Sequence, residues 1–557
     1  MGIWKTLKIE NYRSVGSQIA LSYPEGFPLI VAGENNAGKS NIARALELML
    51  GEAWPTTEPE DHDFHNRDKE LPISIGVDVE GVINTTAGGR SNEVAGFTWN
   101  YPPLDSSGKT FRMLFRNGAD NVYVSSETRE QCTCILIDAD RRLSYQLSYA
   151  SKYTFLSKLM RKFHQSLTED PERVRRLKEK FEETKSTFQE VAPFMAFTEE
   201  LRRQVTEFSG NFEYGLQIDF SAYDPSNFFH ALRVQPQQGD ETLSFDELGT
   251  GQEQVLALSF AYAYASAFHG GGGLTLIIEE PEAHLHPLAQ KWVALKIYEL
   301  ARQGVQIVVT THSPLFLNVL NLNGIALLRK HDGATQVTQL TSHDLSTYCN
   351  EHGASRATPE NILAFYAAGA TDEIMAGLFS RKIVLVEGPS EARALPIYFK
   401  KLGLECSKEG IAIIPVHGVG NIARWWRFFT AFGIPTYVIF DNDADDDLEH
   451  VKRSDILDTL SVTNLEIRTR LLNARTLICG ARLAVFGGNF EQCLRTLFGE
   501  QYIDMERQGS LIYGLSPTRA KPLVARYVAE NISYEREDLR WNDLVQLKER
   551  IVALGTA

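Results

Sequence analysis

The sequence predicts an α/β protein with more than one domain, and three observations carry this prediction. The chain has 557 residues, more than a single hydrophobic core usually holds. Short apolar runs alternate with helical segments in two separate regions, 274–310 and 382–440, as in parallel sheets buried between helices. A glycine-rich segment at 33–40 joins an early strand to a helix. Hydrophobic residues make up 43% of the chain and charged residues 23%, the balance of a folded globular protein.

The first 150 residues are expected to form strands and one helix. Residues 3–32 predict the strands Trp4–Glu10 and Leu29–Val31, and the helix Asn41–Leu50 follows the glycine-rich segment. Alternation of apolar and polar residues then predicts a meander of strands at Ile73–Glu80, Thr110–Phe115, Asn121–Ser125 and Thr133–Ile137.

From Leu143 to about Val205 the pattern becomes helical. Asp170 is a predicted N-cap, with Pro171 at the first helical position. The next segment, Glu172–Glu190, is dense in Arg, Lys and Glu. This composition fits two interpretations equally well. The segment is either a helical arm that projects from the globule or a solvated helix face with no partner.

Strand and helix alternate again from Leu243. The runs Leu274–Ile278 and Val305–Thr310 predict buried strands of a parallel sheet. The polar stretch Thr341–Ala357 is expected to be the loosest connection in the chain. Beyond it a separate α/β domain is predicted, with strands at Lys382–Val386, Ile411–Val416 and Thr436–Phe440.

The formal net charge is −15, and it lies in the first 380 residues, because the chain from Arg381 onwards carries 23 basic and 23 acidic residues. An acidic total argues against a histone-like coat of nucleic acid but allows a local basic groove. Six cysteines do not make a disulfide framework. The longest near-apolar run, Val255–Phe268, is too short to span a bilayer. We therefore expect a cytoplasmic protein without membrane association.

Residues 33–40 read G-E-N-N-A-G-K-S and match the phosphate-binding pattern G-x-x-x-x-G-K-[ST], between a predicted strand and a predicted helix. In such a loop the backbone N–H groups wrap the phosphates, Lys39 reaches the β- and γ-oxygens, and Ser40 is a ligand for Mg²⁺. The residues predicted to bind nucleotide here are Gly33, Asn35, Asn36, Gly38, Lys39, Ser40 and Asn41.

Three further segments support a nucleotide site. Glu279 and Glu280 end a buried strand, where the first suits water-mediated contact with Mg²⁺ and the second suits polarisation of the attacking water. His312 ends another strand, where a γ-phosphate sensor would lie. Gly249 and Gly251 open a helix whose N-terminus can face a phosphate.

These four segments, in this order, resemble the ABC-type ATPases of the SMC and RecF kind, and the opening L-K-I-E-N-Y-R-S of Leu7–Ser14 is similar to their first strand. The resemblance implies that ATP is held between two heads, with the signature helix supplied by the partner head. Two features depart from the family pattern. Glu279 stands where Asp is usual, and the signature does not begin with Leu-Ser-Gly-Gly.

A second set of acidic residues follows strands of the C-terminal region. Glu387 follows one predicted strand, and Glu391 lies at the start of the next predicted helix. About fifty residues later, another predicted strand is followed by Asp441, Asp443 and Asp445. Because the carboxyl ends of parallel strands meet at one edge of a sheet, Glu387, Asp441 and Asp443 are expected to converge. Carboxylates this close repel one another unless cations bind, and oxygen ligands suit Mg²⁺ or Mn²⁺. The acidic run alone would fit a solvated turn.

The Glu-Gly and Asp-x-Asp motifs resemble those of a TOPRIM domain, and a TOPRIM domain after an ABC ATPase resembles the OLD (overcoming lysogenisation defect) nucleases. The resemblance covers residues 3 to about 530. It implies Glu491 as a late metal ligand and Lys521 as a basic residue near the scissile phosphate. The implied fold is an ABC/SMC-like ATPase head with a helical insertion, followed by a Rossmann-like TOPRIM domain. Its parts are ATPase halves at 1–150 and 236–370, a helical insertion and dimerisation arm at 151–235, and a TOPRIM nuclease domain at 378–557.

One segment between the acidic motifs has competing interpretations. Residues 418–423 read G-V-G-N-I-A, which resembles a dinucleotide-binding fingerprint but also suits the strand-to-helix turn that TOPRIM requires. The following R-W-W-R, Arg424–Arg427, either stacks bases and contacts phosphates or forms the core face of a helix, which is the commoner use of paired tryptophans.

The predicted function is an ATP-regulated, divalent-metal-dependent DNA endonuclease or nickase, serving antiphage defence by analogy with the family. The predicted catalytic residues are Glu280, His312, Glu387 and Lys521. The predicted metal ligands are Ser40, Glu279, Glu387, Glu391, Asp441, Asp443, Asp445 and Glu491. The expected cofactors are ATP and Mg²⁺ or Mn²⁺, and the expected partners are DNA, further copies of the chain, and a defence-system protein or nucleic acid. The alternative is a DNA-binding or partner-gating ATPase whose TOPRIM domain is only a scaffold.

Overall fold

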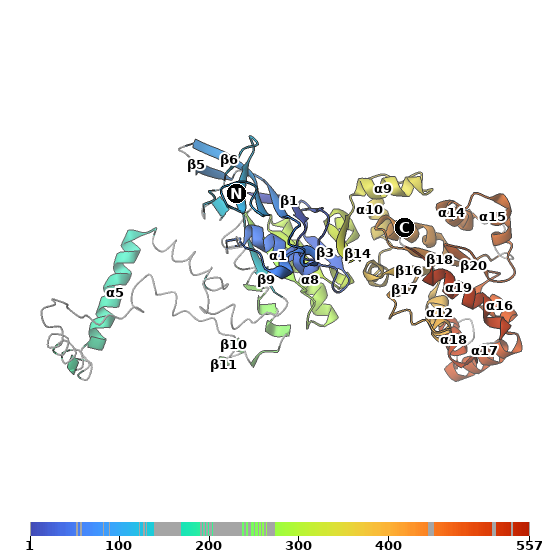
Figure 1. Cartoon of the computed structure of the whole chain (residues 1–557). Coiled ribbons are helices and arrows are strands. Elements are labelled where there is room, and N and C mark those ends of the chain that lie inside the picture. The colour runs from blue at the N-terminus through green and yellow to red at the C-terminus, as the bar shows by residue number, and fades with distance from the viewer. Residues whose placement is uncertain are drawn as a thin grey trace.

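Three large sheets organise the described part of the chain (Figure 1). The computed structural model describes residues 2–138, 169–189, 273–443, 451–514 and 520–555, apart from a few single and paired positions, and only scattered residues of 139–168 and 190–272. An antiparallel sheet and a largely parallel sheet lie in the N-terminal two-thirds. A second largely parallel sheet lies in the C-terminal region. No helix of the described residues is long and apolar enough to cross a membrane.

The antiparallel sheet has the strand order β2-β1-β4-β6-β7-β8, with β5 paired to β6. Its strands are β1 (Ile3–Glu10), β2 (Ile19–Ser22), β4 (Ile73–Glu80), β5 (Asn84–Ala87), β6 (Arg90–Tyr101), β7 (Phe111–Phe115) and β8 (Asp120–Asn121). The predicted strand Asn121–Ser125 is wrong for residues 123–125, which are not in a strand. There the Asn121 side chain accepts a hydrogen bond from the Tyr123 N–H at 2.9 Å, a local turn that ends the ladder.

The second sheet runs β15-β14-β3-β13-β12-β9 and is parallel except at its β15 edge. Its strands are β3 (Leu29–Gly33), β9 (Thr133–Ile137), β12 (Leu274–Glu279), β13 (Gln306–Thr311), β14 (Ile325–His331) and β15 (Ala334–Gln339). Leu29 and Val31 pack in the same cluster as helix α1 (Lys39–Leu50). Ile30 and Ala32 pack with helix α8 (Pro287–Arg302). Because helices cover both faces, β3, β12 and β13 are buried along their whole length.

The C-terminal sheet has the order β17-β16-β18-β20-β19, with only β19 antiparallel. Its strands are β16 (Lys382–Val386), β17 (Ile411–Pro415), β18 (Thr436–Asp441), β19 (Ile478–Cys479) and β20 (Leu483–Phe486). The helices used below are α12 (Pro389–Lys401), α13 (Ile422–Ala431), α14 (Val451–Thr459), α16 (Phe490–Phe498), α17 (Glu500–Tyr513) and α18 (Lys521–Asn531). The three strands predicted from the sequence are all present.

The segment expected to be the loosest connection, Thr341–Ala357, is instead largely helical. Helix α9 (Ser342–Glu351) begins with a capping box, in which Thr341 Oγ1 accepts from Asp344 N at 3.1 Å and Asp344 Oδ2 accepts from Thr341 N at 2.9 Å. Helices α10 (Ile362–Ala367) and α11 (Asp372–Met375) follow. Apolar residues of this connection belong to one hydrophobic cluster that continues from the second sheet into the C-terminal sheet.

Helix α5 (Pro171–Gln189) stands apart from the sheets in Figure 1. Asp170 caps it as predicted, because its Oδ1 accepts from the N–H groups of Glu172 and Arg173 at 3.1 and 3.2 Å. Most of the predicted helical insertion, 151–235, lies outside the described residues, and its role as a dimerisation arm stays a prediction.

Candidate nucleotide site and candidate metal centre

The predicted phosphate-binding loop joins β3 to α1 and depends on two glycines. Gly33 has φ 154° and Gly38 has φ 105°, values that L side chains rarely adopt. A Cβ at Gly33 would lie 2.4 Å from the Leu328 carbonyl oxygen, and one at Gly38 would lie 2.4 Å from Thr335 Oγ1. The loop can therefore close against β14 and β15 only with glycine at these positions. Its backbone leads directly into the N-terminus of α1, where N–H groups attract anions.

Lys39 is buried at the first position of α1. Its Nζ donates to the carbonyl oxygens of Gly33 and Glu34 at 3.1 and 3.0 Å, and lies 3.3 Å from His312 Nδ1. Burial lowers the Lys39 pKa to about 8, and the nearby carboxylate of Glu280 opposes this shift. The buried Lys39 ammonium has only neutral carbonyl oxygens as acceptors in the loop. Because phosphate oxygens carry negative charge, they would be stronger partners for this ammonium, so the loop is a favourable anion site.

The strand ends of β12 and β13 bring the predicted catalytic pair together. Glu280 follows β12 with φ 44°, its N–H donates to Thr310 O at 2.9 Å, and its Oε1 lies 3.2 Å from His312 Nε2. His312 thus bridges Lys39 and Glu280. Sequence reasoning missed Glu282, whose Oε1 accepts from the His312 N–H at 2.6 Å and fixes the start of the histidine turn. The acidic E-E-P-E run was the available signal.

Glu279 is buried at the end of β12. Burial raises its pKa to about 7, and a hydrogen bond from Ser40 opposes the shift. The structure therefore joins the two residues predicted to hold the nucleotide's metal ion. Arg44, which sequence reasoning missed, lies 3.9 Å from Glu279 Oε2 and 2.5 Å from Asp138 Oδ1.

The other predicted nucleotide residues have different surroundings. Asn41 Nδ2 donates to Ser14 Oγ at 2.6 Å, so this amide buttresses the loop from the side of β1. Asn35 and Asn36 are exposed on the loop. A Cβ at Gly251 would lie 3.1 Å from the His284 carbonyl oxygen, which places this glycine beside the turn after β12. Gly249 donates its N–H to Gln252 Oε1 at 3.0 Å at the start of the same helical segment.

The second set of predicted residues gathers at the carboxyl edge of the C-terminal sheet. Glu387 follows β16, Asp441 ends β18, and Asp443 comes two residues later. Glu391 and Glu491 stand in the first turns of α12 and α16. The side chains of Glu391, Asp441 and Glu491 are buried, and Asp445 lies outside the described residues.

The five carboxylates act on one another electrostatically. Burial raises the pKa of Glu391 to about 7, and the charges of Glu491 and Glu387 add to the shift. Burial, Glu391 and Glu387 hold the pKa of Asp441 well above its usual range. The pKa of Glu387 is raised by burial and then by Asp443. The raised pKa values of Glu387, Glu391 and Asp441 mean that their ionised forms are costly in this site, and bound cations would offset that cost.

Three of these carboxylate oxygens are candidate ligands for a cation. Among the described residues, Glu387 Oε2, Asp441 Oδ1 and Glu491 Oε1 are buried and have no hydrogen-bond partner. Buried acceptors without partners cost free energy, and a hard divalent ion would satisfy them. As their side chains lie, the described residues contain no group of three His, Cys, Asp or Glu side chains arranged to hold a metal ion. Coordination would therefore require these carboxylates to turn toward a common point.

Two basic side chains neutralise part of this set. Lys521 begins α18, and its Nζ lies 2.9 Å from Glu491 Oε2. Burial lowers its pKa, but the ion pair and the nearby Asp441 and Glu391 outweigh burial and raise it. Arg453 of α14 donates from Nε to the Asp441 carbonyl oxygen at 2.8 Å and forms an ion pair with Asp443. Sequence reasoning missed Arg453, because one arginine on a predicted helix carries no signal.

The turn at 418–423 serves the C-terminal sheet. Gly418 has φ 120°, and its N–H donates to the Glu387 carbonyl oxygen at 2.9 Å. Trp425 and Trp426 of α13 are 1% and 4% exposed. The interpretation of this helix as a core face is therefore confirmed, and the base-stacking alternative is wrong for the two tryptophans.

Comparison with known proteins gives both domains a counterpart. Residues 378–443 match the family "overcoming lysogenization defect protein-like, TOPRIM domain", and residues 91–317 match the AAA ATPase domain family. The chain is 27% identical to the OLD nuclease of Thermus scotoductus over 454 residues, 79% of this chain and 82% of the relative. It is 26% identical to the Old nuclease of Escherichia phage P2 over 38% of this chain and 35% of the relative.

The chain is similar to a solved Smc head domain with an extended coiled coil from Pyrococcus furiosus, bound to the C-terminal domain of ScpA. The match covers 63% of this chain and 99% of the Smc chain. It has 16% sequence identity and a TM-score of 0.34. The two domain families imply use of a nucleotide and of divalent metal in general.

Proposed function

Because the chain joins an AAA ATPase domain to an OLD-like TOPRIM domain, we propose that it is an ATP-regulated nuclease that hydrolyses phosphodiester bonds of DNA with divalent cations. The observation that carries this proposal is the set of five mutually repelling carboxylates at one sheet edge, three of them with buried oxygens that lack a partner. A cation bound among these carboxylates would offset this cost.

In this proposal Glu387, Asp441 and Asp443 hold one cation, and Glu391, Asp445 and Glu491 contribute to a second. Bound Mg²⁺ or Mn²⁺ would activate a water and stabilise the leaving oxygen. Lys521 would exchange its Glu491 partner for a phosphate oxygen and stabilise negative charge in the transition state. Arg453 keeps the Asp441–Asp443 backbone in place through its two contacts.

At the other site we propose that Lys39 contacts the β- and γ-phosphates of ATP and that Ser40 and Glu279 hold its Mg²⁺. Glu280 would orient the attacking water, and His312, which touches both Glu280 and Lys39, would sense the γ-phosphate. Gly251 lies beside the turn after β12 in its own head, and Gly249 is at the start of the same helical segment. Their predicted contact with phosphate would therefore be made across a homodimer, to which α5 would add its surface.

One ion pair supports regulation of the nuclease by ATP. Glu34 lies inside the phosphate-binding loop, and its Oε2 is 3.0 Å from Nε of Arg381, the residue before β16. Arg329 holds the Arg381 carbonyl oxygen at 2.9 Å. A phosphate that displaces Lys39 from the Glu34 carbonyl oxygen would therefore disturb the contact between Glu34 and Arg381 at the start of β16. The other end of β16 leads to Glu387, a proposed metal ligand.

DNA is the proposed substrate, and the relative in phage P2 is consistent with a part in conflict between bacteria and phages. A defence-system protein or nucleic acid would be a further partner, and the cytoplasm the expected location. Two ion pairs, Lys521–Glu491 and Arg453–Asp443, favour the alternative in which the domain is a scaffold, because they neutralise two carboxylates without metal.

A nicking assay separates the two functions. Supercoiled plasmid is incubated with Mg²⁺ or Mn²⁺, with and without EDTA, and with the variants Glu387→Gln and Asp441→Asn. The nuclease proposal expects loss of nicking in EDTA and in both variants, with ATP hydrolysis retained. Exposed Glu409→Gln is the matched control and should nick normally. Equal nicking by a mock preparation, or full activity of the double variant, would defeat the proposal.

A further inference from the structure

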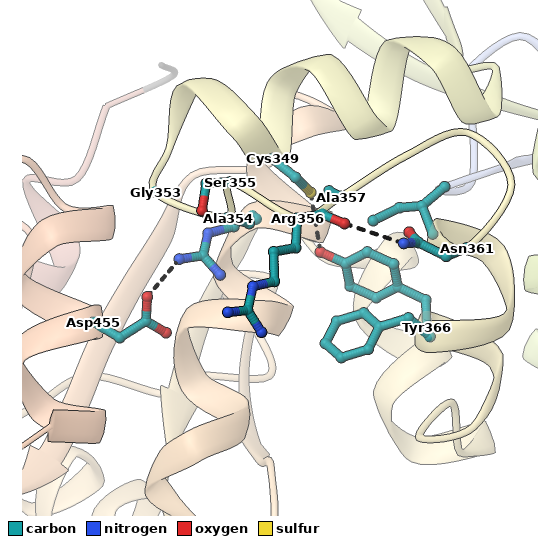
Figure 2. Close-up of a pocket in the computed structure, with 12 residues that line it drawn as sticks. Cys349, Gly353, Ala354, Ser355, Arg356, Ala357, Asn361, Tyr366 and Asp455 are labelled. Atoms are coloured by element: carbon teal, nitrogen blue, oxygen red, sulfur yellow. Dashed lines mark hydrogen bonds and ion pairs between the residues drawn. The ribbon is translucent and has the colours of Figure 1, made fainter.

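A cavity of about 490 Å³ lies where the connecting helices α9 and α10 meet α13 and α14 (Figure 2). This volume is within the range of small-molecule sites. None of the residues proposed above for ATP or metal lines it. Its walls combine apolar side chains with a few polar groups from different elements, as ligand sites do.

One cation of this cavity is not neutralised by the described residues. Arg356 is exposed, and no described residue forms a hydrogen bond or ion pair with its side chain. In Figure 2 the side chain extends into the space between Asp455 and Tyr366. The second arginine, Arg427, is fully engaged. Its Nη2 lies 2.9 Å from Asp455 Oδ1, and its Nε donates to the His352 carbonyl oxygen at 2.7 Å.

The lining of the cavity also includes an aromatic surface. Phe365 is 52% exposed, although it is a large apolar side chain. The Arg424 guanidinium lies over one face of its ring, 4.1 Å from the ring centre. Beside it, Tyr366 is buried and donates its hydroxyl to the Arg424 carbonyl oxygen at 2.9 Å. The exposed part of the Phe365 ring is available to stack on a planar group.

A guanidinium without a described partner and a half-exposed aromatic ring that line the same cavity match the chemistry of a nucleotide. We propose that this cavity binds a nucleoside phosphate, with the phosphate paired to Arg356 and the base stacked on Phe365. The nucleotide is either free or the end of a DNA strand. This site is separate from the phosphate-binding loop and adds a second nucleotide contact to the chain.

The position of the cavity links such a ligand to the candidate metal centre. Helix α14 contributes Asp455 to the cavity wall, and Arg453, two residues earlier on the same helix, contacts Asp441 and Asp443. A phosphate near Asp455 repels it and competes for Arg427. The bound nucleotide would therefore act on α14, which anchors the Asp441–Asp443 segment.

The test measures binding to the full chain by calorimetry, in EDTA so that no strand is cleaved. The probes are deoxyadenosine monophosphate, and a single-stranded oligonucleotide with either a 5′-phosphate or a 5′-hydroxyl. Lys39→Ala is the background, so that the phosphate-binding loop contributes little. In the Lys39→Ala background, the further change Arg356→Ala should weaken nucleotide binding roughly tenfold or more, because a charge-assisted hydrogen bond is lost. Phe365→Leu should weaken binding roughly fivefold, and Arg356→Lys should restore part of the affinity.

Exposed Lys408→Ala, outside the cavity, is the control and should bind as the background does. Binding of the mononucleotide that depends on Arg356 identifies a free nucleotide as ligand. Dependence on Arg356 for the 5′-phosphorylated oligonucleotide alone identifies the strand end. If neither probe binds, or if Arg356→Ala and Phe365→Leu bind as tightly as Lys408→Ala, the proposal is wrong. These binding results do not depend on cleavage, so they stand apart from the nuclease proposal.

Discussion

Glu391 offers a direct measurement of the electrostatic cost of the candidate metal centre. Burial and the neighbouring carboxylates raise its pKa from 4.5 to about 7. Because the folded-state pKa is the higher one, the contribution of this group to stability is fully present below pH 4.5. It is lost as the pH rises through 7. With 1.36 kcal/mol for each pKa unit, the ionised group costs the metal-free protein about 3 kcal/mol at pH 8, and below about 1 kcal/mol at pH 5.

The variant Glu391→Gln removes this charge and keeps an oxygen that can accept from the Gly388 N–H, as Glu391 Oε2 does at 3.2 Å. In EDTA at pH 8 we expect the variant to be more stable than the parent by up to about 3 kcal/mol, with little difference at pH 5. Urea unfolding followed by tryptophan fluorescence measures both values, and exposed Glu500→Gln in α17 is the control. Added Mg²⁺ should stabilise the parent more than the variant.

An equal change in stability at both pH values would refute this reasoning, because only a titrating group produces a difference between them. A variant that is destabilised at pH 8 would also refute it. The carboxyl would then be held by contacts stronger than its electrostatic cost.

Three further changes test the nucleotide site and its link to the nuclease. Lys39→Ala should weaken ATP binding about tenfold or more in an equilibrium titration, since a buried charged contact is lost; unchanged affinity would contradict the assignment. Glu280→Gln should keep ATP binding but lower the hydrolysis rate roughly a hundredfold, and a normal rate would move that role to another residue. Arg381→Ala breaks the ion pair with Glu34, so nicking should respond less to ATP while both activities persist; an unaltered response would exclude this route.

The sequence predicts β12, β13 and β16 of the two parallel sheets because these strands are mostly apolar, as burial on both faces requires, but it misses the edge strands β15 and β19 and their neighbours β14 and β20. It misses β6, whose twelve residues include Gly96 at the irregularity where the register with β7 shifts. It also misses α9, whose polar surface looks like a loop, although the Thr341–Asp344 capping box was readable.

The site residues also divide into those that a local sequence pattern marks and those that it does not. Glu387 and Asp441 directly follow buried strands, so topology alone brings them to one edge. Arg453 and Arg381 act through contacts with residues that are distant in the sequence or lie across a domain boundary. No local pattern marks such partners, because tertiary packing chooses them.

The hydrophobic cluster shared by the second and C-terminal sheets determines where the nuclease half can be cut from the chain. Tyr366 of α10 lies 5.1 Å from Phe428, ring centre to ring centre, and a Cβ at Gly377 would meet Ile414 and Phe429 within 2.8 Å. A fragment that begins at 378 would therefore leave Phe428 and Phe429 uncovered. The smallest portable unit begins near Thr341, and a chimaera that exchanges ATPase heads must keep the connecting helices with the C-terminal half.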